Sequence, residues 1–166
     1  MKYQGVLFLA ALTSACDPPG PTTEMHEKDL LTVQRLAVKG NLDAMHDLCY
    51  RYKYGRRADQ NYEKALEWCL KAAALGADSS QVLLAEMYYY GQGVPLDYSK
   101  AAAWYQAAAF QGHAHALLML YDIYSEGRGV PQDRELALGY LQRAADAGYQ
   151  KAIDELAKIQ AATHDR

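Results

Sequence analysis

The sequence predicts an all-α protein, a right-handed α-solenoid built from helix-turn-helix repeats. Three observations favour this fold class. Glycines recur every 36 residues, alanines and aromatic residues keep the same spacing, and glycine and proline separate the predicted helices at fixed positions. With 166 residues, 51% of them apolar, the chain is long enough to form the continuous core of one domain.

One complete repeat unit lies at residues 90–112, with the sequence YGQGVPLDYSKAAAWYQAAAFQG. Gly91 and Gly93 permit the positive φ values of a tight loop, and Pro95 prevents the preceding helix from continuing. Asp97 can cap the helix that follows. That helix has high intrinsic propensity and ends at a glycine suited to the left-handed conformation. The segment therefore contains a loop, a helix start and a helix stop.

Shifting this unit by 36 residues in either direction finds the same pattern. The positions that stay in phase are Gly40, Gly76, Gly112 and Gly148; Gly55, Gly91 and Gly127; Ala65, Ala101 and Ala137; Trp68, Trp104 and Tyr140; Leu48, Leu84 and Leu120; and Tyr52, Tyr88 and Tyr124. Each helix pair is too small to bury its own apolar face, so neighbouring repeats must cover it. We interpret these alanines and aromatic residues as framework; an aromatic ligand pocket is the alternative.

The segment YGQGVPLDYSKAAAWYQAAAFQGHAHA resembles the Sel-one-like repeat (SLR), a helix-turn-helix relative of the tetratricopeptide repeat. The resemblance covers residues 41–148 as three repeats. It implies an α-solenoid that binds other proteins, and it implies no catalytic residues. In each repeat we call the first helix A and the second helix B.

The pattern predicts where each helix begins and ends. Helix A is expected at residues 42–54, 78–90 and 114–126, and helix B at 62–75, 98–111 and 134–147. Asn61, Asp97 and Asp133 are the expected cap residues of the B helices. We expect an N-terminal capping helix within residues 25–40 and a C-terminal capping helix and tail at 149–166, with the helix at 150–161.

The N-terminus has the features of a targeting segment. Residues 1–15 combine a basic start with a short apolar run that is too short to span a bilayer. The sequence LTSAC at 12–16 resembles a bacterial lipobox, which implies lipidation of Cys16; an ordinary signal peptide or a buried helix ending in cysteine are the alternatives. Residues 16–24, rich in proline and polar residues, are expected to be a tether. We expect a lipid-anchored protein of the bacterial envelope that faces the periplasm.

Composition and motifs exclude several classes of function. The 17 Lys and Arg against 20 Asp and Glu provide no strongly basic field, which argues against nucleic-acid binding. The sequence has no Ser-x-x-Lys, Gly-x-Ser-x-Gly or His-Glu-x-x-His motif and no phosphate-binding glycine loop. His113 and His115 diverge on a helix and have no cysteine at zinc-site spacing. We expect no catalytic residue, metal or cofactor.

Repeat one differs from the others in its cysteines and its loop. Cys49 and Cys69 stand where repeat two has Ala85 and Tyr105. An oxidising envelope permits a disulfide between them, and two buried thiols are the alternative. The loop at residues 54–59, YGRRAD, lacks the usual second glycine and proline and gains two arginines. We interpret this segment as a solvated variable loop; a basic patch formed with Arg51 and Lys53, which contacts an acidic partner or anionic lipid, is the alternative.

The resemblance also implies where a partner binds, because residues of helix A that face away from the core line the concave surface of such solenoids. Projecting the repeat phase gives fifteen candidate partner-binding residues: Asp43, His46, Tyr50, Lys53, Tyr54, Ser79, Val82, Glu86, Tyr89, Tyr90, His115, Leu118, Asp122, Ser125 and Glu126. This set contains four tyrosines that the packing of the repeats does not need: Tyr50, Tyr54, Tyr89 and Tyr90. Such tyrosines are typical interface anchors; packing within the solenoid is the alternative. We expect Tyr89→Ala with Glu86→Arg to abolish binding at nearly unchanged melting temperature.

We therefore predict a non-catalytic envelope lipoprotein that binds a protein partner. Its size and architecture are similar to SLR lipoproteins that protect bacteria from secreted antibacterial effectors, including phospholipases, which implies an immunity protein. A scaffold or regulator of cell-envelope enzymes is the alternative. A β-lactam-hydrolysing enzyme is a third hypothesis, taken from cysteine-rich relatives, and the absent Ser-x-x-Lys and the different cysteine spacing argue against it.

Overall fold

The computed structural model describes residues 21–164, and this part of the chain is all-helical. The eight helices are α1 (Pro21–Val38), α2 (Leu42–Tyr54), α3 (Tyr62–Ala74), α4 (Asp78–Tyr90), α5 (Tyr98–Phe110), α6 (Ala114–Glu126), α7 (Arg134–Asp146) and α8 (Gln150–His164). The expected signal peptide, Cys16 and the first residues of the expected tether lie outside the described residues. Among the described helices, none is both long and apolar enough to cross a bilayer.

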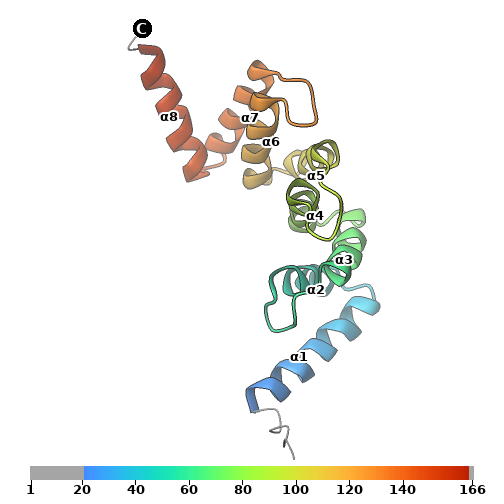
Figure 1. The fold of residues 1–166 in the computed structure, drawn as a ribbon. Helices are drawn as coiled ribbons and strands as arrows, with labels where there is room; N and C mark the ends of the chain where they lie inside the picture. Colours follow the sequence, from blue (N-terminus) through green and yellow to red (C-terminus); the bar gives the residue numbers. More distant parts are fainter. Residues whose placement is uncertain (1–20, 165–166) are drawn as a thin grey trace, which may run out of the picture.

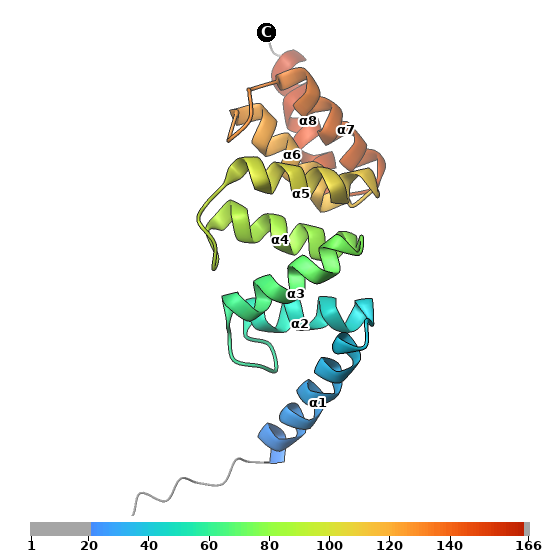
Figure 2. The same ribbon diagram turned by 90° about the vertical axis from the view of Figure 1, so that its right-hand side faces the viewer.

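The helices form an open, curved stack with α1 at one end and α8 at the other (Figure 1). Three helix pairs, α2 with α3, α4 with α5 and α6 with α7, make up the repeats, and each helix packs against the next in sequence. Turned by 90°, the stack shows the repeats lying one above another (Figure 2). The expected α-solenoid with a terminal helix at each end is confirmed.

The A helices have the expected bounds, and the B helices end one residue early, at Ala74, Phe110 and Asp146. Helix α1 begins at Pro21, so the part of the expected tether from residue 21 to 24 is helical instead. Proline is compatible with the first helical position, where its missing N–H would have no intrahelical partner. Helix α8 continues to His164, beyond the expected end at residue 161.

Capping explains why the helix starts were predictable. The side chains of Asn41, Asn61, Asp97 and Asp133 accept a hydrogen bond from the backbone N–H three residues later, at 2.8 to 2.9 Å. These bonds satisfy donors that a helix N-terminus leaves without a partner. Helices α4 and α6 begin without a side-chain cap, because Ala77 and His113 occupy the cap position. Their starts depend on the preceding turn and on packing.

The second loop glycine is required at the junction between repeats. Gly93 and Gly129 have φ values of +71° and +67°, which favour glycine. A Cβ added at Gly93 would lie 2.5 Å from the Cβ of Tyr62, and one added at Gly129 would lie 2.6 Å from the Cβ of Tyr98. The loop of each later repeat therefore packs directly on the first residue of helix B in the repeat before it. Repeat one has Arg57 at this position, with φ +56°.

The core consists of two clusters of buried residues. One runs from Ala37 on α1 to Met87 on α4, and the other from Val82 on α4 to Ala152 on α8. Tyr88 and Trp104 are partly buried and contact both clusters. The predicted framework positions are part of this core: Ala65, Ala101, Ala137, Leu48, Leu84 and Leu120 are fully buried, Tyr52 is buried, and Trp68, Tyr124 and Tyr140 are partly buried against it.

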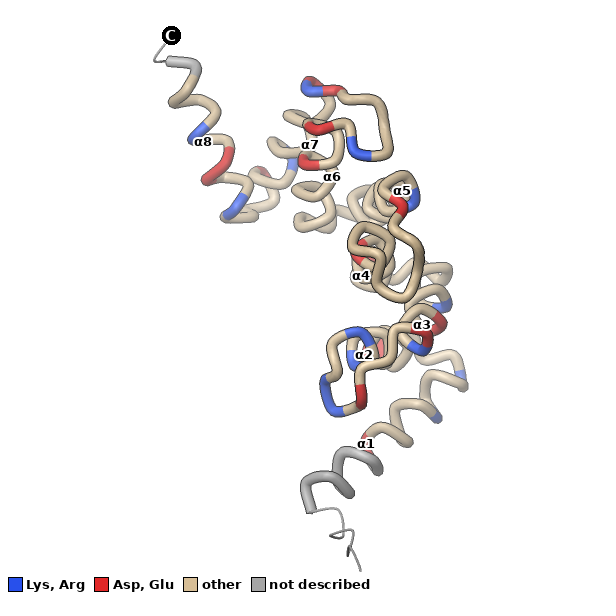
Figure 3. Tube along the Cα trace, in the orientation of Figure 1, with Lys and Arg blue, Asp and Glu red and all other residues tan. Residues whose placement is uncertain are grey.

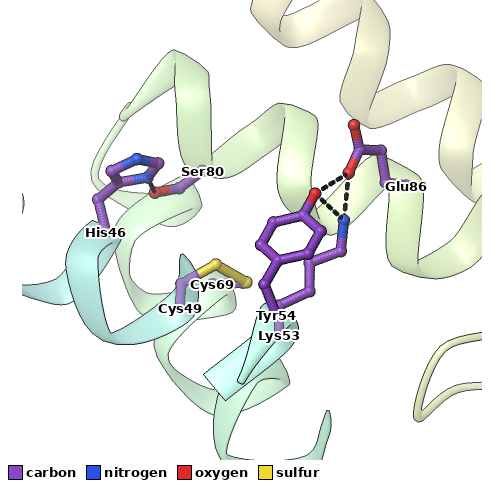
Figure 4. The surroundings of a disulfide bond; sticks show 7 residues. All are labelled: His46, Cys49, Lys53, Tyr54, Cys69, Ser80 and Glu86. Atoms are coloured by element: carbon purple, nitrogen blue, oxygen red, sulfur yellow. Dashed lines mark hydrogen bonds and ion pairs between the residues drawn. A yellow bond between two sulfur atoms is a disulfide. The ribbon is translucent and has the colours of Figure 1, made fainter. Parts of the chain in front are cut away.

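A disulfide joins Cys49 on α2 to Cys69 on α3, with the Cα atoms 4.9 Å apart (Figure 4). Both cysteines are fully buried. The bridge therefore links the two helices of repeat one from within the core. In repeat two the position of Cys69 is taken by Tyr105, whose buried hydroxyl has no hydrogen-bond partner among the described residues.

Candidate protein-binding surface

The candidate surface is the helix-A face, which we define as the positions of the fifteen predicted residues on α2, α4 and α6 together with the positions 36 residues later on α8. Five of the fifteen predicted residues are exposed there: Asp43, Tyr50, Tyr54, Tyr90 and Glu126. Seven are partly buried: His46, Ser79, Glu86, His115, Leu118, Asp122 and Ser125. Helices α2, α4 and α6 all contribute, so the exposed positions extend along the stack.

Three predicted surface residues, Lys53, Val82 and Tyr89, are buried, so their assignment to the exposed surface is wrong. Their side chains fill the space between neighbouring repeats, which a projection of one repeat does not include. Val82 and Tyr89 belong to the core cluster that joins repeats two and three. Lys53 is 2% exposed because it points from repeat one toward Glu86 in repeat two. Some positions that the repeat phase assigns to the surface therefore pack between repeats instead.

Glu86 is the centre of a polar cluster that links all three repeats. It forms an ion pair with Lys53 and accepts a hydrogen bond of 2.9 Å from the Tyr54 hydroxyl (Figure 4). Its second carboxylate oxygen lies 3.6 Å from His115 Nε2 on α6, and His115 Nδ1 lies 3.2 Å from the Tyr149 hydroxyl. Because Glu86 is held on both sides, it is a structural residue of the helix-A face.

The surroundings of Glu86 determine its ionisation. Burial favours the neutral acid, but the neighbouring His115 imidazole and the charge of Lys53 outweigh this effect and lower the pKa of Glu86 to about 2. Burial lowers the pKa of Lys53, and Glu86 opposes that change. Replacing Glu86 by arginine would place two cations together, so the structure gives a reason to expect a loss of stability in the Tyr89→Ala, Glu86→Arg variant, which the sequence pattern alone did not.

Tyr89 is covered by a residue of the next repeat. The Arg128 guanidinium, from the loop after α6, donates to the Tyr89 hydroxyl and lies 5.7 Å from the Tyr89 ring centre and 5.9 Å from that of Tyr98. Arg128 also pairs with Glu126 at 2.5 Å. A cation held over two aromatic rings and against a carboxylate is a strong arrangement. Tyr89 is therefore framework, while its neighbour Tyr90 stays 59% exposed.

The histidines do not form a metal site, and no group of three metal-ligating side chains occurs in the part of the chain that the structure describes. His46 Nδ1 lies 2.9 Å from Ser80 Oγ, across the junction between repeats one and two. His113 precedes α6, and its buried Nδ1 has no hydrogen-bond partner among the described residues. His115 is turned toward Glu86. His113 is the cap residue of α6, so only His115 lies within the helix on which both were predicted.

In repeat one, only part of the alternative basic patch is accessible. Arg51 is buried and pairs with Asp29 at 2.6 Å and Asp47 at 2.8 Å, so its charge is neutralised within the fold. Lys53 is neutralised by Glu86. Arg56 and Arg57 remain exposed in the loop between α2 and α3. In Figure 3 part of this loop has the blue colour of Lys and Arg. Two of the four cations serve junctions between helices, so the structure does not support the alternative of a four-residue patch.

One feature of the helix-A face was not predicted, a groove of about 520 Å³ between α6 and α8. It is lined by Leu118, Tyr121, Asp122, Ser125, Glu126, Lys151, Asp154, Glu155 and Lys158. The α6 residues, except Tyr121, were among the predicted set. The α8 residues were missed because α8 was treated only as a cap, although the same repeat phase places Lys151, Asp154 and Lys158 on the helix-A face.

Comparison with known proteins agrees with this architecture. The Sel1 repeat model matches residues 42–76, 78–113 and 114–149. The chain belongs to the Sel1 repeat family. Sel1 repeat proteins mediate protein–protein interaction, and their fold is generally a non-catalytic interaction scaffold. Comparison with curated proteins gave no match.

Solved Sel1 repeat structures are similar to the chain. A Sel1 repeat protein from Oxalobacter formigenes is 35% identical, with a TM-score of 0.71 over 79% of this chain and 98% of that one. A protective antigen with an SLR fold from uropathogenic Escherichia coli is 32% identical, with a TM-score of 0.74; the match covers 76% of this chain and 27% of the antigen. Cysteine-rich protein B of Helicobacter pylori, 20% identical, shares the fold with a TM-score of 0.66 over 82% of this chain and 98% of that one.

Proposed function

We propose that this Sel1 repeat protein is a lipid-anchored immunity protein of the bacterial envelope. It faces the periplasm and binds a secreted antibacterial effector, such as a phospholipase, through its helix-A face. The N-terminal resemblance to a lipoprotein signal supports the anchor at Cys16. The anchor would hold the protein at the membrane surface, where a phospholipase acts.

The observation that carries the proposal is a set of exposed tyrosines on the helix-A face. Tyr50 and Tyr54 on α2 are each 42% exposed, and Tyr90 on α4 is 59% exposed. The rings of Tyr50 and Tyr54 are 4.8 Å apart, so they form one aromatic surface beside Glu86. Tyrosine is enriched among residues that dominate protein interfaces. Tyr54 also donates a hydrogen bond to Glu86 of the next repeat, whereas the hydroxyls of Tyr50 and Tyr90 form no hydrogen bond with any described residue.

The mechanism we infer is steric. A rigid solenoid that covers the active site of an effector inhibits it without contributing a reacting group. The fixed Glu86 cluster and the disulfide in repeat one keep the tyrosines in place before binding, which reduces the entropy lost on association. Inhibition would then require only complementary shape and charge.

The experiment is a pull-down with the full chain, extracted in detergent, from the producing strain and its secreted fraction. Recovery of one stoichiometric secreted hydrolase whose activity the chain blocks would support the proposal. Expression of the chain should also protect a sensitive strain from that hydrolase. Recovery of resident cell-wall enzymes that keep their activity would refute the immunity function and favour a scaffold.

Variants connect the binding to the tyrosines. Tyr90→Ala should weaken binding of the recovered partner at least about tenfold, as for an interface hot spot. Phe110→Ala is the matched control, because Phe110 is an aromatic residue that is 92% exposed but lies on the B helix α5. Equal binding by wild type and Tyr90→Ala would remove the tyrosines from the interface. Cys16→Ser should move the protein from the membrane fraction to the soluble fraction.

A further inference from the structure

The groove between α6 and α8 has an excess of negative charge. Four carboxylates, from Asp122, Glu126, Asp154 and Glu155, line it together with Lys151 and Lys158. Lys158 is used within the groove, since its Nζ lies 3.0 Å from Glu155. The aromatic ring of Tyr121 forms part of the same lining.

Asp122 differs from the other carboxylates in the groove. Glu126 pairs with Arg128 at 2.5 Å, Asp154 accepts a hydrogen bond of 2.8 Å from Gln150, and Glu155 pairs with Lys158. The carboxylate of Asp122 is partly buried and has no hydrogen bond or ion pair with any residue that the structure describes. A partly buried anion without a partner is an unfavourable arrangement that a bound cation would relieve.

The electrostatic surroundings of Asp122 agree with this view. Burial raises the pKa of the Asp122 carboxyl, and the nearby charges of Glu126 and Glu155 raise it further. Arg128 and His115 act in the opposite direction, but the net shift is upward. The fold therefore supplies less positive charge than this end of the helix-A face needs.

The chain itself contains an example of the complementary contact. At the preceding junction, Arg128 lies over the rings of Tyr89 and Tyr98 and pairs with Glu126. A guanidinium there is held by aromatic faces and a carboxylate at once. In the groove, the ring of Tyr121 and the carboxylate of Asp122 offer the same two kinds of group to a cation from outside the chain.

We propose that this groove receives an arginine- or lysine-bearing segment of the protein partner. The segment lies between α6 and α8, with one cationic side chain paired to Asp122 and its neighbours facing Glu126 and Asp154. The assignment rests on the proposed function, because the segment belongs to the protein that the helix-A face binds. It adds the chemical class of the contact. The partner supplies cations at the end formed by α6 and α8, and this chain supplies aromatic rings where Tyr54 and Tyr90 are exposed.

The test is an NMR titration of the full chain in detergent with a short peptide of alternating arginine and glycine, at about 0.15 M salt to screen weak surface contacts. Backbone amide shifts should change mainly at residues 118–126 and 151–158. A peptide with glutamate in place of arginine should cause no change there. Shifts spread over all acidic surfaces, or equal effects of the two peptides, would overturn the proposal.

Matched variants make the test specific. The double variant Asp122→Asn, Glu126→Gln should have an about tenfold lower affinity for the arginine peptide, because two charge-assisted contacts are lost. The control is Glu63→Gln with Glu135→Gln, which removes two exposed carboxylates from the B helices α3 and α7 and should leave affinity unchanged. Equal weakening by the two double variants would show general charge attraction and refute the site.

The same variants separate this proposal from the proposed function. If the wild-type chain retains an inhibited secreted hydrolase and the Asp122→Asn, Glu126→Gln variant retains it equally well, the groove is not the contact, although the immunity function stands. If no stoichiometric partner is retained but the arginine peptide still binds at α6 and α8, the groove recognises cationic segments and the immunity function fails.

Discussion

At the scale of single residues, Glu86 contacts side chains of both neighbouring repeats. It pairs with Lys53 of repeat one, accepts from Tyr54 and faces His115 of repeat three. Lys53 has almost no access to solvent, so its charge depends on this pair. The contacts that fix Glu86 also fix the positions of Tyr54 and its neighbour Tyr50 on the helix-A face.

Removing the charge of Glu86 should destabilise the fold. Glu86→Gln leaves the Lys53 ammonium buried without an anion, and breaking a buried pair in this way costs about 3 kcal/mol or more. Urea unfolding monitored by circular dichroism measures the change, with Glu135→Gln on the exposed face of α7 as the control. A loss no larger than in the control would show that Lys53 is neutralised or solvated in another way.

Acid should weaken the protein through the same residue. The pKa of Glu86 is about 2 in the fold, against 4.5 as its ordinary value. A depressed pKa contributes stability that is present above pH 4.5 and lost as the pH falls toward 2, on the order of 3 kcal/mol in total. Unfolding free energies measured across this range should fall less steeply in Glu86→Gln than in wild type. Parallel curves would contradict the assigned pKa.

At the scale of elements, the loops after the A helices determine how the repeats stack. Gly91 and Gly93 lie in one loop and have nearly equal φ values of +67° and +71°. Around Gly91 the nearest atoms to an added Cβ are 3.5 Å away, whereas at Gly93 Tyr62 is 2.5 Å away. The two positions therefore carry a similar conformational cost and differ in the space available.

Alanine substitutions should separate these two effects. Gly91→Ala should lower the free energy of unfolding by about 1 kcal/mol, because alanine is strained in the left-handed conformation. Gly93→Ala should lower it clearly more, because the added Cβ also forces the loop away from α3. Comparison of their urea midpoints measures the difference. Equal losses would mean that the loop can move from Tyr62 without disturbing the junction between repeats one and two.

Most helix boundaries were predictable because their causes are local. A 36-residue glycine period, a side-chain cap at Asn61, Asp97 or Asp133, and a left-handed glycine after helix A each act within a few residues. The assignment of single residues to the surface was less successful. The burial of Tyr89 depends on Arg128, and that of Lys53 on Glu86, and both partners come from the following repeat.

The groove was missed for a different physical reason. Repeat phase assumes that every A helix has a B helix and a following repeat, but α8 has neither within the described chain. Among the described helices, α8 packs mainly against α7. The repeat phase places Lys151, Asp154 and Lys158 beside the α6 residues, but the open space between α6 and α8 follows from packing at the end of the stack.

For the whole molecule, stability depends on the contact between two core clusters. The first contains repeat one and its disulfide, and the second contains most of repeats two and three. Trp104 and Tyr88 contact both clusters, whereas Trp68 packs only against the first. In a solenoid each repeat contacts only its neighbours, so weakening one junction can separate units that otherwise unfold together.

Trp104→Ala should uncouple the two clusters, and Trp68→Ala should not. Each variant keeps one of the two tryptophans, so the fluorescence of Trp68 or Trp104 reports a local region while circular dichroism reports all helices. In Trp104→Ala the Trp68 fluorescence should follow the disulfide-linked repeat one and change at a higher urea concentration than the circular dichroism. In Trp68→Ala the two transitions should coincide, although both variants lose roughly 3 kcal/mol. Coincident transitions in both variants would show one cooperative unit, and the helix-A face would then form or melt as a whole.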